Sequence, residues 1–98
     1  MDKEQALNLV KQYKQVVCSI LSSPKVFLYG SYPKGTATKD SDIDVAVIVP
    51  SLGNDWLKIS GKLWYATLAV STLIEPVLLE EGDNSPLYRD IMKTGVAV

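Results

Sequence analysis

Residues 30–44 read GSYPKGTATKDSDID and lie between two short apolar runs. The first run, Val26–Tyr29, has the composition of a buried β-strand and stops at Gly30. The second run, Ile43–Val49, is almost purely apolar, rich in β-branched residues and closed by Pro50. The polar residues between the runs predict a loop, with room for one helical turn at its start.

The segments on either side of these runs predict three helices and a third strand. Apolar residues recur at helical spacing over 3–21, after an N-cap at Asp2. The second helix is predicted over 56–71 after a cap at Asp55, and a strand follows over 73–79. Ser85 then caps a last helix that ends near residue 95, and residues 96–98, which read VAV, can add a short strand.

Two aspartates stand at the start of the second predicted strand. Asp42 and Asp44 are two residues apart, so both side chains project from the same face. Ionised carboxylates at this spacing repel each other, and a bound divalent cation removes that repulsion. The pair therefore predicts a metal site at the mouth of the core.

The turn after the first predicted strand has the features of a phosphate site. Gly30 lets the backbone turn sharply and approach a ligand closely, and Ser31 adds a hydroxyl donor. Backbone N–H groups at a strand-to-helix turn can hold a phosphate oxygen. Lys34 lies nearby and either neutralises part of a triphosphate or is a solvated loop lysine.

The two sites can touch one nucleotide only if the first two strands are antiparallel. The long helical crossover before the third strand suits a parallel neighbour of the second. Pro76 cannot donate a ladder hydrogen bond, which predicts an edge strand. Glu75 then falls beside Asp42 and Asp44. The whole pattern predicts an α/β or α+β domain with helices on a small mixed sheet of three to four strands.

Composition limits the chemistry and the setting. The chain has 98 residues, which fits a single domain over 1–98, and a net charge of -1, which argues against general nucleic-acid binding. It has no histidine, so metal ligands must be oxygens, which favours Mg²⁺ or Mn²⁺. Its one cysteine, Cys18, is expected to be buried and predicts a reducing cytoplasm. No apolar run approaches the length of a membrane span.

Gly30-Ser31, ten further residues and then Asp42-x-Asp44 resemble the signature of the polymerase-beta-type nucleotidyltransferase superfamily. The short chain is similar to its minimal nucleotidyltransferases, which are often antitoxin partners of HEPN-domain proteins. The resemblance implies that Gly30, Ser31 and Lys34 hold ATP phosphates, and that Asp42, Asp44 and Glu75 bind two Mg²⁺ ions. Glu75 replaces the more usual aspartate, so it is implied either as catalytic base or as metal ligand only.

The resemblance implies transfer of AMP from ATP to a hydroxyl of a HEPN-type toxin. Two alternatives stay open. The chain could be a binding module that neutralises its partner by covering it, or a transferase for small molecules such as aminoglycosides. The chain lacks the further domain that would wrap a small substrate, although an oligomer could supply that wall.

The predicted helix over 56–71 carries more apolar residues than one sheet-facing stripe needs. Either the helix is deeply packed, or it exposes an apolar patch that binds another chain or a second copy. Trp64 and Tyr65 are the residues expected at such an interface.

Overall fold

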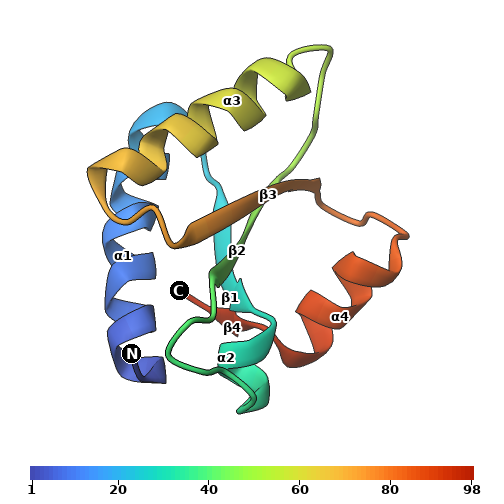
Figure 1. The fold of residues 1–98 in the computed structure, drawn as a ribbon. Coiled ribbons are helices and arrows are strands. Elements are labelled where there is room, and N and C mark those ends of the chain that lie inside the picture. The colour runs from blue at the N-terminus through green and yellow to red at the C-terminus, as the bar shows by residue number, and fades with distance from the viewer.

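The computed structural model describes residues 1–98, as a four-stranded sheet with helices on both faces (Figure 1). Its elements follow the predicted order, with one helical turn inside the first loop. They are α1 (Lys3–Ile20), β1 (Lys25–Tyr29), α2 (Ser31–Lys34), β2 (Ile43–Val49), α3 (Trp56–Ala66), the 3-10 helix η1 (Thr67–Ala69), β3 (Ile74–Glu80), α4 (Pro86–Thr94) and β4 (Val96–Ala97).

The sheet has the strand order β3-β2-β1-β4 and is mixed. β1 runs antiparallel to β2 and to β4, whereas β2 and β3 are parallel. The predicted strand directions and the predicted edge position of β3 are therefore confirmed. Pro76 lies in this edge strand, the position in a sheet where a residue without a backbone N–H is tolerated.

Side-chain alternation along the strands divides the core into two parts. On one face, β1 and β2 contribute Val26, Leu28, Val45 and Val47 to a core that α1 and α3 cover. On the other face, a smaller core gathers around Ile91 of α4. Figure 1 shows α1 and α4 on opposite sides of the sheet.

The three long helices begin directly after the residues that were predicted as their N-caps. Asp2 and Gln5 form a complete capping box on α1, and the Ser85 side chain accepts from the N–H of Tyr88 at the start of α4. Asp55 is the N-cap residue of α3, as predicted, although its side chain makes no capping hydrogen bond. The helix also tightens at Thr67 into a 3-10 turn instead of continuing as an α-helix.

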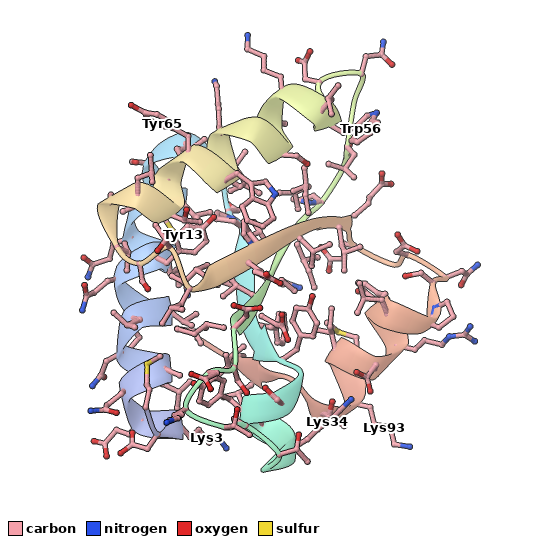
Figure 2. The ribbon with its side chains drawn as sticks, in the orientation of Figure 1. Lys3, Tyr13, Lys34, Trp56, Tyr65 and Lys93 are labelled. Atoms are coloured by element: carbon pink, nitrogen blue, oxygen red, sulfur yellow. The ribbon has the colours of Figure 1, made fainter.

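Two long-range hydrogen bonds fix α1 against the rest of the domain. The Tyr13 hydroxyl donates to the Leu63 carbonyl over 2.7 Å and links α1 to α3 inside the core (Figure 2). The Lys14 ammonium donates to the Val98 carbonyl over 2.6 Å and holds the C-terminal end of the chain. Cys18, on the same helix, is exposed, so the prediction of a buried cysteine was wrong. It lies outside the stripe that faces the sheet.

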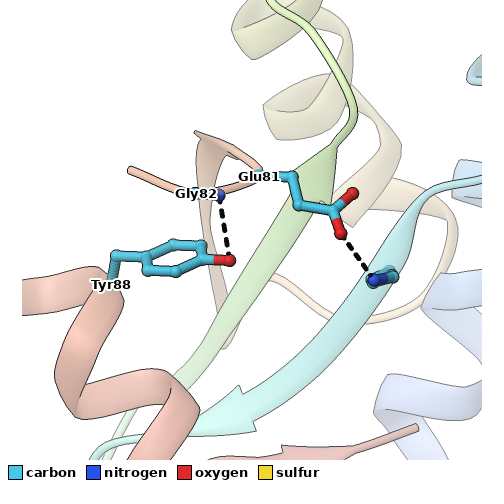
Figure 3. A network of polar contacts seen from close by, with 4 residues as sticks. Glu81, Gly82 and Tyr88 are labelled. Atoms are coloured by element: carbon cyan, nitrogen blue, oxygen red, sulfur yellow. Dashed lines mark hydrogen bonds and ion pairs between the residues drawn. The ribbon is translucent and has the colours of Figure 1, made fainter. Parts of the chain in front are cut away.

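A small polar network closes the end of the sheet where β1 begins and β3 ends (Figure 3). Lys25 and Glu81 form an exposed ion pair at 2.9 Å, and the Gly82 N–H donates to the Tyr88 hydroxyl over 3.1 Å. The predicted site residues lie at the opposite end. No helix is long and apolar enough to cross a membrane.

Candidate active site at the start of β2

Three side chains form a row across the sheet at the candidate site. Tyr29 at the end of β1 pairs with Asp44 of β2, and Asp44 pairs with Glu75 of β3. Residues paired in this way project from the same face, here the face that α4 covers. Asp42 precedes β2 by one residue, is exposed, and belongs to the same face by alternation. The sheet register therefore brings the three predicted carboxylates together.

The electrostatics of the row show an excess of negative charge. Partial burial raises the pKa of Asp44 above its usual value, and the neighbouring charge of Asp42 raises it further. Glu75 also has a raised pKa, first because of the Asp42 charge and then because of partial desolvation, a hydrogen bond with Asp42 and the Asp44 charge. The charges of the row thus make ionisation of Asp44 and Glu75 more costly.

Gly30 is required beside this row for two reasons. Its φ of +80° lies in the region that side chains rarely adopt. In addition, a Cβ at this position would collide with the Asp44 carboxylate oxygen. The turn after β1 therefore lies directly against the Asp44 carboxylate of β2, as a site shared by the two segments requires.

The α2 turn begins at Ser31, which is half-buried, and ends at Gly35 in the left-handed region. The first N–H groups of a helical turn have no partner within the helix, so they can bind a ligand. Tyr32 packs into the core, and its buried hydroxyl has no hydrogen-bond partner. Its burial leaves it in the fold and not on a nucleotide base.

Lys34 points from α2 to α4, where it forms an ion pair with Asp90 at 3.0 Å (Figure 2). Both side chains remain more than a third exposed. The pair connects the predicted phosphate turn to the helix that covers the same sheet face. Lys34 is thus near the site, but its ammonium group has a carboxylate partner within the chain.

The carboxylates suit a hard divalent cation by chemistry, since all three offer oxygen ligands and share an unfavourable charge. As the side chains are placed, no group of three or more acidic, cysteine or histidine residues converges tightly enough to hold an ion. Asp42 and Glu75 are exposed, so their side chains have more freedom to move than the half-buried Asp44. The three carboxylates fit a magnesium site by their chemistry, and an exposed side chain among them would have to move to complete the set of ligands.

Two residues near the site were not predicted from the sequence. Tyr29 was predicted only as a strand residue, yet burial and the charges of Asp44 and Glu75 raise the pKa of its hydroxyl. The antiparallel register of β1 and β2 was the signal that could have placed it there. Asp90 had no sequence signal, because the packing of α4 alone brings it to Lys34.

The glycine turn after β1 and the paired acids at the start of the antiparallel β2 have the arrangement that the sequence resemblance implied. The chain belongs to the nucleotidyltransferase domain family, whose model matches residues 10–92. The matched segment contains both the turn and all three carboxylates. The chain is accordingly a nucleotidyltransferase, as predicted.

Relatives and solved structures agree with this membership. The chain is 26% identical to the Methanocaldococcus jannaschii protein "Putative protein adenylyltransferase MJ0141", over 94% of this chain and 97% of that protein. It shares its fold with "a putative nucleotidyltransferase from Sulfolobus solfataricus" at a TM-score of 0.71 and 20% identity, covering 97% and 80% of the two chains. A toxin-antitoxin structure with AMP-PNP is similar at a TM-score of 0.51 and 22% identity, covering 99% and 72%.

Proposed function

We propose that this chain transfers AMP from ATP to a hydroxyl group of a protein partner. The observation that supports it most is the short distance between the Gly30 turn and the Asp44 carboxylate, since a phosphate held at that turn would lie beside the acidic row. The similarity to a protein named as an adenylyltransferase supports a protein acceptor. The similarity to a structure with AMP-PNP supports an adenine nucleotide.

In this proposal Asp42, Asp44 and Glu75 hold two Mg²⁺ ions, with Mn²⁺ as a substitute. Such ions, when bound, neutralise charge on the attacking and leaving oxygens. The turn at Gly30 and Ser31 holds the phosphates through backbone N–H groups and the serine hydroxyl. These groups keep the α-phosphate in line with the incoming hydroxyl, and positioning of this kind carries most of phosphoryl-transfer catalysis.

The bond changes follow from the substrates. The acceptor oxygen forms a bond to the α-phosphorus, the bond from that phosphorus to the bridging oxygen breaks, and pyrophosphate leaves. The acceptor proton needs a base, and Glu75 is the candidate. Its exposed position on the edge strand leaves its carboxylate accessible to the hydroxyl of an acceptor.

We further infer that the acceptor is a HEPN-type toxin and that the chain acts as its antitoxin in the cytoplasm. The fold shared with toxin-antitoxin structures supports this role. A second candidate function is a binding module that neutralises the partner by covering it. The exposed side chains of α3 favour that candidate, since Trp64 is 50% and Tyr65 77% exposed.

Transfer of label separates the two functions. The purified chain is incubated with Mg²⁺, ATP labelled at the α-phosphate, and the protein product of the neighbouring gene. Label on that protein, lost with Asp42→Asn/Asp44→Asn and kept with Asp40→Asn, supports transfer. A tight complex without label supports the binding module instead.

A further inference from the structure

An open groove with a volume of about 900 Å³ runs between α1 and the α3–η1 segment, away from the candidate active site. Val16 and Ile20 of α1 form one wall, and Tyr65 and Leu68 form the other. Tyr65 and Leu68 are 77% and 67% exposed, so the walls are apolar and open to solvent. In Figure 2, Tyr65 lies on the outer side of α3.

Gly61 lies in the middle of α3 and lines the groove. A glycine in a helix interior costs about 1 kcal/mol relative to alanine. No packing within the chain requires it, because a Cβ at this position would meet no atom within 4 Å. Its φ is also ordinary. What the missing side chain provides is space for the backbone of another molecule to approach α3 closely.

The charge at the groove has one sign. Lys58 and Lys62 line it from successive turns of α3, and neither forms an ion pair within the chain. Lysines four residues apart repel each other in a helix. α3 contains no acidic residue, and residues 11–20 of α1 contain none either. The acidic residue that precedes the helix, Asp55, stands three positions before Lys58 but forms no ion pair with either lysine.

These features distinguish between occupants. A second copy docking α3 against α3 would place lysines against lysines without a carboxylate on either helix. An amphipathic helix of a different chain, with carboxylates on both edges of its apolar face, would cover the apolar walls and pair with both lysines. We propose that the groove docks such an acid-edged helix of a partner protein, with Gly61 as the point of closest approach.

The probe for this proposal is a fluorescent helical peptide with leucine at positions i, i+3, i+4 and i+7 and glutamate on both flanks. A matched peptide has lysine in place of glutamate. Anisotropy is expected to show binding of the acidic peptide only. Lys58→Glu/Lys62→Glu should reverse the preference, whereas Lys11→Glu/Lys93→Glu, with the same charge change on other surfaces, should keep it.

Gly61→Ala provides a second readout that misfolding cannot imitate. The variant should melt at a higher temperature than the wild type and bind the acidic peptide at least about tenfold more weakly, a loss of about 1.4 kcal/mol. Equal binding by both peptides would overturn the proposal. So would a dimer in sedimentation that Leu68→Glu dissociates, because a second copy would then fill the groove.

Discussion

At the scale of single residues, Gly30 connects the phosphate turn to the acidic row. Its backbone conformation and its contact with Asp44 both exclude a side chain. Gly30→Ala is expected to lower the free energy of unfolding by about 1–3 kcal/mol through backbone strain. It should also abolish transfer, because Asp44 must move.

Chemical denaturation and the label-transfer assay together test this expectation. Gly53→Ala is the matched control, since a Cβ at this position would meet no atom within 4 Å and Gly53 has no positive φ. It should leave activity unchanged. Full activity in Gly30→Ala would show that the Asp44 position beside this turn is irrelevant to the reaction.

The raised pKa of Asp44 makes stability depend on pH in a defined direction. The folded state holds the proton more tightly than the unfolded chain, so ionisation favours unfolding. This cost is complete above the folded-state pKa and disappears below the unfolded value near 3.9. Asp44→Asn should therefore stabilise the protein at neutral pH, by about 0.5 kcal/mol given its partial exposure.

Melting curves of the wild type and Asp44→Asn between neutral pH and about pH 3 check this sign. The stabilisation should shrink as the pH falls, and Asp40→Asn, an exposed loop change, should show none. The Asp44 side chain accepts no hydrogen bond that the substitution would remove. A lower stability of Asp44→Asn at neutral pH would therefore contradict the repulsion between the carboxylates.

Lys34 can contribute to nucleotide binding only if it exchanges Asp90 for a phosphate. The exposed pair itself is worth about 0.2–1 kcal/mol, so Lys34→Ala should hardly affect stability. A lysine bond to phosphate is worth about 1.5–3 kcal/mol, so the same change should weaken ATP binding at least about tenfold. Lys39→Ala is the control in a calorimetric titration. Equal ATP affinities of the two variants would show that Lys34 does not contribute to nucleotide binding.

At the scale of the elements, the α1–α3 contact depends on one buried hydrogen bond. Tyr13 is fully buried, and burial raises the pKa of its hydroxyl well above the usual value. Tyr13→Phe leaves the Leu63 carbonyl without this donor and should cost about 1–3 kcal/mol. Tyr65→Phe, on exposed surface of the same helix pair, should cost almost nothing in the same urea titration. Equal midpoints for the two variants would show that water replaces the bond.

The elements were predictable from sequence where local rules determine them. Ile43–Val49 was predicted with its exact boundaries because an apolar β-branched run ends at a proline. The end of α3 was not, because the chain passes into a 3-10 turn at Thr67 without a glycine or proline to mark the change. The antiparallel direction of β1 and β2 followed from the need to bring the turn and the acids together, and the parallel direction of β3 from its long helical crossover; the register confirmed both.

At the scale of the whole molecule, the site depends on segments distant in sequence. Asp44 and Glu75 are paired because β3 runs parallel to β2, and the helical crossover between these strands predicted this proximity. The ion pair of Lys34 with Asp90 spans 56 positions, and no local pattern marks Asp90. Contacts that arise only from the docking of α4 could not be predicted from the sequence.

The domain thus has two separate surfaces, an acidic row under α4 and an apolar groove beside α3. The first suits a nucleotide with its metal ions, and the second suits a partner chain. Their separation means that a change in one should leave the other intact. Gly61→Ala should therefore keep nucleotide binding while it weakens docking.

The central claim is that the Gly30 turn and the acidic row form one nucleotide–metal site. Titration calorimetry with a non-hydrolysable ATP analogue, with and without Mg²⁺, tests it most directly. We expect binding that requires Mg²⁺, disappears in Asp42→Asn/Asp44→Asn and persists in Asp40→Asn. Equal binding with and without Mg²⁺, or undiminished binding by the double variant, would contradict the claim.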